Sequence, residues 1–163
     1  MGKVILGVLF IALCIFVVFN LSNTDTAPTE VYYPDPTGYV IDTANIISPE
    51  VEQLLTAMIK ESTHEIAVVT VESTKPLNIE EYSIKLAEKL QVGDKDKDDG
   101  VILLIASEDR KIRIEVGYGL EGVLNDAKAG RILDEYIVPH LKNNDWDTGI
   151  TAGIREIIKT TNN

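Results

Sequence analysis

The chain has 163 residues, and the part from Tyr39 onward is long enough for one domain with its own core but too short for two. Its formal net charge of -11 disfavours nucleic acid and anionic lipid headgroups as partners and favours cations. The only cysteine, Cys14, lies in an apolar stretch, so that domain can have no disulfide, thiolate nucleophile or cysteine metal site.

The chain begins with an apolar segment at residues 4–21, VILGVLFIALCIFVVFNL, which has 18 residues and no charge. As a helix it would be about 27 Å long, close to the thickness of the hydrocarbon core of a bilayer. Lys3 precedes it and no basic residue follows closely, so the positive-inside rule places the chain start in the cytoplasm. We predict a membrane anchor at residues 1–21, with the rest on the extracytoplasmic (periplasmic) side. A cleaved signal peptide is the alternative, although the apolar run exceeds a usual h-region.

Residues 22–38 are polar and contain three prolines, which predicts an extended linker before a domain at residues 39–163. In that domain, a short strand precedes Asp42. Ser48 and Pro49 are suited to the N-cap and first position of a helix. The β-branched run IAVVTV at residues 66–71 predicts a strand. Asn78 and Glu81 then predict the start of a second helix, which ends at Gly93.

The second half of the domain begins with the apolar run VILLIA at residues 101–106, which predicts a buried strand. The alternating Ile112, Ile114 and Val116 predict a half-exposed strand that pairs with it as a hairpin. Residues 126–141 and 147–160 predict two helices. The order β, α, β, α, β, β, α, α predicts an α/β fold, a layered sandwich in which helices flank a small mixed sheet.

Two features that often carry chemistry are set aside. His64 and His140 belong to no H-E-x-x-H or G-x-S-x-G pattern, and we interpret both as surface or capping residues. Residues 117–122, GYGLEG, match the G-x-G-x-x-G string of dinucleotide sites. The next helix begins too late to face a pyrophosphate, however, and Glu121 would place a negative charge in the cradle. We expect these glycines to allow a sharp turn and a close backbone approach.

Acidic residues cluster at the predicted ends of strands and helices. The run DKDKDDG at residues 94–100 has the alternation of an EF-hand start, but Ile105 occupies the closing position where that loop needs glutamate. Loops at one end of a sheet converge, which predicts a cluster of carboxylates that a cation would neutralise. Oxygen ligands favour Ca²⁺, with Mg²⁺ as the alternative. The predicted metal ligands are Asp42, Asp98, Asp99, Glu121 and Asp126.

The segment from Asp98 to Leu133, DDGVILLIASEDRKIRIEVGYGLEGVLNDAKAGRIL, resembles the central signature of the TPM-domain family. The resemblance extends over nearly all of residues 39–160. It implies an extracytoplasmic or lumenal domain that binds divalent cations. Members include a thylakoid acid phosphatase linked to photosystem repair and an accessory subunit of acetylcholine receptors. The acidic site of the family corresponds here to Asp42, Asp99, Glu121 and Asp126, with aspartate at position 99 where many members have asparagine.

Two functions remain open. The favoured one is a non-catalytic, calcium-binding accessory module for membrane-protein partners, with a monomeric soluble domain and no nucleic-acid partner. The alternative is a metal-dependent acid phosphatase that hydrolyses phosphomonoesters by direct water attack, with Asp126 and Asp99 as catalytic carboxylates. The phosphatase would need a cationic clamp beside the carboxylates, from Arg110, Arg113 or Arg131.

Overall fold

The computed structural model describes residues 30–162, and the compact unit within it begins at Val31. The anchor predicted at residues 1–21 lies outside the described residues. Among residues 30–162, no helix has the length and apolar character needed to cross a membrane.

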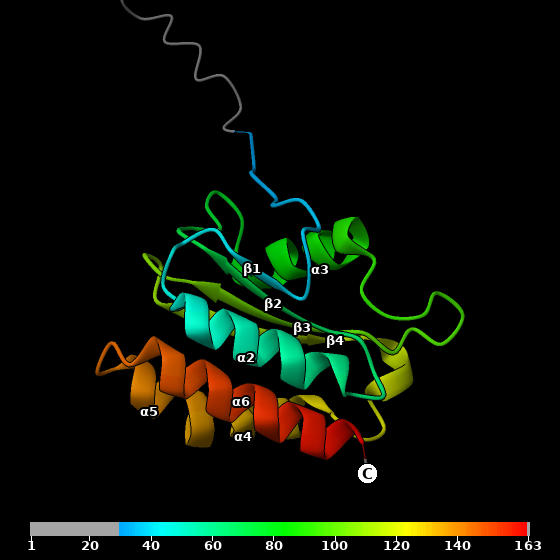
Figure 1. Cartoon of the computed structure of the whole chain (residues 1–163). Coiled ribbons are helices and arrows are strands. Elements are labelled where there is room, and N and C mark those ends of the chain that lie inside the picture. Colours follow the sequence, from blue (N-terminus) through cyan, green and yellow to red (C-terminus); the bar gives the residue numbers. More distant parts are fainter. Residues whose placement is uncertain (1–29, 163) are drawn as a thin grey trace, which may run out of the picture. The chain divides into compact units, whose positions relative to one another are not determined.

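A four-stranded mixed sheet forms the centre of the domain, which confirms the predicted α/β class (Figure 1). Its strands are β1 (Val40–Asp42), β2 (Ile66–Val71), β3 (Val101–Ala106) and β4 (Lys111–Val116), in that spatial order. The first three strands are parallel, and β4 runs antiparallel to β3 as the predicted hairpin. β2 and β3 are buried along their whole length, as their continuous apolar sequences predict.

Helices cover both faces of the sheet (Figure 1). One face carries α3 (Ile79–Leu90), and the other carries α2 (Pro49–Lys60) and α6 (Trp146–Thr161). Side chains of β2 and β3 alternate between the two core layers: Val68 packs with the α2 and α6 layer, while Val69 packs with the α3 layer. The predicted caps are confirmed, since Ser48 Oγ accepts a hydrogen bond from Val51 N and Asn78 Oδ1 accepts one from Glu81 N.

The helix predicted at residues 126–141 contains a π-helical segment. It consists of α4 (Asp126–Ile132), the π segment η2 (Leu133–Ile137) and α5 (Val138–Leu141). Pro139 has no N–H to donate to the preceding turn, which explains why regular α-helical bonding gives way just before it. α6 packs closely on this region, because a Cβ at Gly153 would meet the side chain of Ile137.

The packed domain begins before Tyr39, where the sequence predicted its boundary. The hydroxyl of Tyr82 on α3 donates to the carbonyl of Tyr32 at 2.6 Å. The ring of Tyr33 stacks on that of Tyr82 with centroids 4.7 Å apart, and Lys89 Nζ donates to the Tyr33 carbonyl. The last part of the predicted linker at residues 22–38 is therefore attached to α3.

Candidate functional site

The predicted metal ligand Asp42 ends β1 at the carboxyl end of the parallel strands. The register pairs it with Thr70, near the end of β2. Its carboxylate accepts hydrogen bonds from the amides of Ile46 at 3.2 Å and Ile47 at 2.9 Å, and from the hydroxyl of Thr70. Asp42 therefore holds the loop between β1 and α2 in place.

Asp98 and Asp99 lie at the opposite end of the parallel strands, because they precede β3 whereas Asp42 is the last residue of β1. Thr70, the partner of Asp42, pairs in turn with Ile105, six residues after Asp99. At about 3.3 Å per residue this separates the levels of Asp42 and Asp99 by about 20 Å along the strands. An oxygen ligand lies only about 2.5 Å from a calcium ion. The prediction that Asp42 shares an ion with Asp99 is therefore wrong.

Asp99 is buried beneath the loop of residues 94–98, with 9% of its surface exposed. Its Oδ1 accepts a hydrogen bond from Asp94 N at 2.9 Å, and its Oδ2 lies 3.1 Å from His64 Nδ1. The Asp94 amide and, to a smaller extent, His64 lower the pKa of Asp99. His64, predicted as a surface or capping residue, is instead the side-chain partner of a buried carboxylate. The sequence contains a signal for this contact. His64 lies just before β2 and Asp99 lies just before β3, and these two parallel strands are paired.

The glycine loop after β4 packs against the backbone of Asp98. Gly119 N donates to Asp98 O at 2.8 Å, Tyr118 N donates to Asp98 Oδ2 at 3.0 Å, and Gly117 N donates to Gly100 O. A Cβ at Gly117 or Gly119 would meet the carbonyls of Asp98 or Lys97, which confirms the predicted close approach. These three amides already have acceptors and are not available to cradle a phosphate.

A groove of about 530 Å³, which we call the acidic groove, lies between α3 and the glycine loop. It is lined by five carboxylates and one ammonium group, that of Lys95. The carboxylates are those of Glu88, Asp94, Asp98, Glu115 and Glu121. Two predicted ligands, Asp98 and Glu121, thus share this groove. Asp126 is exposed at the start of α4 and does not line it.

The described residues that line the acidic groove form no compact set of metal ligands. In residues 30–162, no three His, Cys, Asp or Glu side chains are grouped so that they could hold a metal ion. Asp98 Oδ2 is taken by Tyr118 N, and Asp94 Oδ1 by Asp96 N. Among the described residues, the other carboxylate oxygen of Asp98 and of Asp94 accepts no hydrogen bond.

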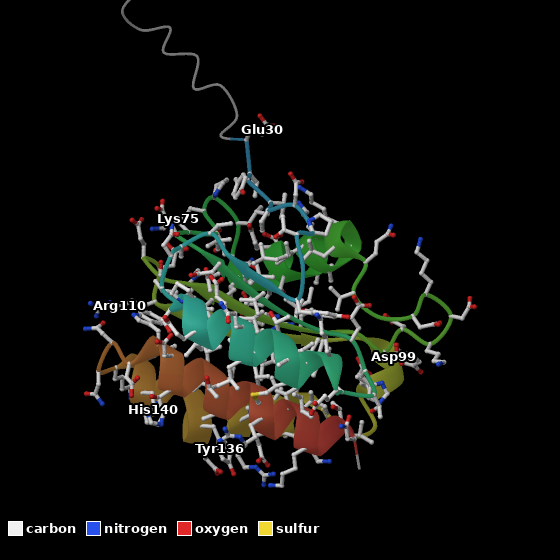
Figure 2. All side chains as sticks on the ribbon, in the orientation of Figure 1. Glu30, Lys75, Asp99, Arg110, Tyr136 and His140 are labelled. Atoms are coloured by element: carbon white, nitrogen blue, oxygen red, sulfur yellow. The ribbon has the colours of Figure 1, made fainter. Side chains whose placement is uncertain are left out.

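Of the arginines proposed as a phosphate clamp, Arg110 and Arg131 lie away from the acidic groove, while Arg113 is paired with Glu115 of its lining. Arg113 Nε donates to Glu115 at 2.7 Å and to Ser83 Oγ at 3.0 Å. Arg110 lies in the turn between β3 and β4, and Figure 2 shows it at the opposite end of the domain from Asp99. Arg131 is exposed on α4. None of the three lines the groove.

Comparisons with known proteins agree with this fold. Comparison with curated proteins gives no significant match. The N-terminal domain of a P. gingivalis protein is 29% identical with a TM-score of 0.70, covering 80% of this chain and 92% of that domain. The BA42 protein of the psychrophilic bacterium Bizionia argentinensis is 19% identical with a TM-score of 0.61, covering 71% and 81%. The N-terminal domain of cg2496 from Corynebacterium glutamicum is 20% identical with a TM-score of 0.60, covering 82% and 88%.

The last two similarities, at lower identity, concern the fold alone. The sequence itself carries the family assignment, because the family model described as the TPM domain matches residues 40–160. That match spans the sheet, its helices and the acidic groove, and the chain therefore belongs to the TPM-domain family.

Proposed function

We propose that this TPM domain is a membrane-anchored, extracytoplasmic accessory module whose acidic groove binds a divalent cation and contacts a membrane-protein partner. The observation that carries the proposal is the charge of the groove, whose lining has a single lysine and five acidic residues, of which only Glu115 is paired with an arginine. Such a lining attracts cations and repels the dianion of a phosphomonoester. Binding of a cation therefore has electrostatic support that binding of a phosphoester lacks.

Asp98 and Glu121 are the residues we assign to the cation, with Asp94 as a third contact. Asp98 is held in a left-handed backbone conformation, with φ of 50°, by the glycine loop that packs against it. Its carboxylate is thereby fixed before any ion arrives, which reduces the ordering that binding would require. We propose Ca²⁺ as the ion and Mg²⁺ as the alternative, bound partly through water.

The alternative function, an acid phosphatase, has one observation in its favour. Asp99 orients the ring of His64 through Nδ1, an arrangement that in hydrolases prepares the other ring nitrogen to accept a proton. Asp99 itself is buried and both its oxygens are engaged, which opposes the predicted catalytic role. Asp126 does not line the acidic groove, and no arginine lines it either.

Titration of the full chain, in a neutral detergent, with CaCl₂ and MgCl₂ tests the cation site by NMR. We expect shifts at the amides of Asp98, Gly119 and Glu121. The double variant Asp98→Asn, Glu121→Gln should lose them, because both anionic ligands are removed while asparagine keeps the left-handed backbone acceptable. Asp126→Asn is the matched control and should keep them. Shifts unchanged in the double variant would refute the assignment.

The phosphatase alternative is tested separately, by hydrolysis of p-nitrophenyl phosphate with and without CaCl₂. The accessory module should show no turnover above that of a heat-denatured sample. Turnover that disappears in both His64→Gln and Asp99→Asn would favour the phosphatase.

The membrane side is tested with alkaline phosphatase fused after Asn163, which is active only outside the cytoplasm. An inactive fusion that is expressed at a normal level would contradict the proposed orientation.

A further inference from the structure

A second cavity, of about 550 Å³, lies at the opposite end of β3 and β4 from the acidic groove. The end of β3 and the turn into β4 form one wall, and α5 with the turn into α6 forms the other. Its charged lining residues are Arg110, Lys111 and Lys142, with no carboxylate among them. We call it the basic pocket.

The three cations of the basic pocket have no anionic partner. Within residues 30–162, neither Arg110 nor either lysine forms an ion pair. Two nearby carboxylates are engaged elsewhere, since Asp109 pairs with Lys75 at 3.1 Å and Asp145 lies 3.4 Å from His140, while the exposed Glu108 does not line the pocket. The chain has 26 acidic and 15 basic residues, so its net charge is negative. A pocket with three unpaired cations and no acid is therefore opposite in sign to the protein as a whole.

The remaining wall of the basic pocket is apolar. It is formed by side chains such as Ile112, Val138, Leu141 and Trp146. A bare inorganic anion would gain nothing from this surface, whereas a ligand with an apolar group would bury it there. The volume also lies within the range of small-molecule sites, roughly 300 to 1,000 Å³.

We propose that the basic pocket binds a small organic anion, a phosphate, phosphonate or carboxylate attached to an apolar or aromatic group. The planar guanidinium of Arg110 can bind two oxygens of such an anion at once, and the two lysines add charge. The apolar group would contact Leu141 and Trp146. Ser107 is the only hydroxyl in the lining, and no lining histidine or carboxylate is present to activate it. The pocket is therefore a binding site separate from any hydrolytic chemistry.

Trp146 provides the test, because it is the only tryptophan of the chain. We would titrate the full chain, in neutral detergent, with phenylphosphonate and follow tryptophan fluorescence. A saturable change is expected. The double variant Arg110→Gln, Lys142→Gln should bind at least about tenfold more weakly, because charge-assisted hydrogen bonds are lost. Lys85→Gln, an exposed charge on α3, is the matched control and should bind like the unmodified chain.

Two further probes separate the parts of the proposal. Inorganic phosphate that binds as tightly as phenylphosphonate would overturn the role of the apolar wall. Benzyl alcohol that binds as tightly would overturn the role of the cations. Absence of any saturable change with phenylphosphonate would overturn the site itself. If circular dichroism shows the double variant to be unfolded, the role of the cations is tested by titrating the unmodified chain with NaCl. Salt should weaken phenylphosphonate binding, and binding that does not change with salt would overturn the role of the cations.

Discussion

Asp109, in the turn between β3 and β4, is the residue whose contribution to stability is most directly testable. Its side chain is 4% exposed. Ser73 Oγ and Thr74 N each donate to Asp109 Oδ2 at 2.9 Å, and Lys75 Nζ lies 3.1 Å from Oδ1. The Thr74 amide above all, helped by Lys75 and Ser73, lowers the pKa of Asp109 to about 2.

The lowered pKa gives the size of the contribution that Asp109 makes to stability. A fall from the usual 3.8 to about 2 corresponds to about 2 kcal/mol of stability at neutral pH, at about 1.36 kcal/mol per unit. We expect Asp109→Asn to lose about that much, because asparagine keeps the shape but not the charge. The contribution of a carboxylate with a lowered pKa is complete above its unfolded value and is lost as the pH falls toward the folded one. The difference between the two proteins should therefore shrink between about pH 4 and pH 2.

Urea denaturation at a series of pH values measures this difference. Glu108→Gln is the matched control, since Glu108 is exposed in the same turn, and it should change stability by less than about 0.5 kcal/mol. The reasoning is refuted if Asp109→Asn behaves like the control at neutral pH. It is equally refuted if the deficit stays constant on acidification.

Two further predictions concern packing and the acidic loop. In thermal denaturation, Gly153→Ala should destabilise by about 1 to 3 kcal/mol, since its Cβ would meet Ile137. Gly130→Ala should instead stabilise by about 0.5 to 1 kcal/mol, because it is helical with nothing within 4 Å of a new Cβ; equal effects of the two would contradict this account. Asp99→Asn should speed amide hydrogen exchange in residues 94–98, because the hydrogen bond from Asp94 N loses its charged acceptor, and unchanged exchange would show that Asp99 does not hold the loop.

The elements of the fold could be predicted because their signals are local. The runs at residues 66–71 and 101–106 became strands with the predicted bounds, and the caps at Ser48 and Asn78 began the predicted helices. The π segment before Pro139 was missed, because the hydrophobic pattern continues through it. The attachment of Tyr33 to α3 was also missed, since it depends on a stacked partner distant in sequence, Tyr82.

The candidate site was harder to predict because strand direction decides which loops meet. Asp42 ends a parallel strand, while Asp99 precedes one, and such positions lie at opposite ends of the strands. The predicted order of strands and helices already implies this separation. A grouping of the carboxylates by residue type alone overlooks it. Glu121 joins Asp98 because β4 returns antiparallel to β3. The basic pocket combines two segments distant in sequence, around Arg110 and Lys142, and no local pattern marks it.

The two outer strands of the sheet also bear on self-association. β1 has only three residues, and β4 alternates core-facing isoleucines with Lys111, Arg113 and Glu115. Short or charged outer strands give another copy little to hydrogen-bond against, and so hinder growth of a continuous intermolecular sheet. A domain whose outer strands resist such growth can remain dispersed at high concentration, where edge-to-edge aggregation would otherwise be favoured.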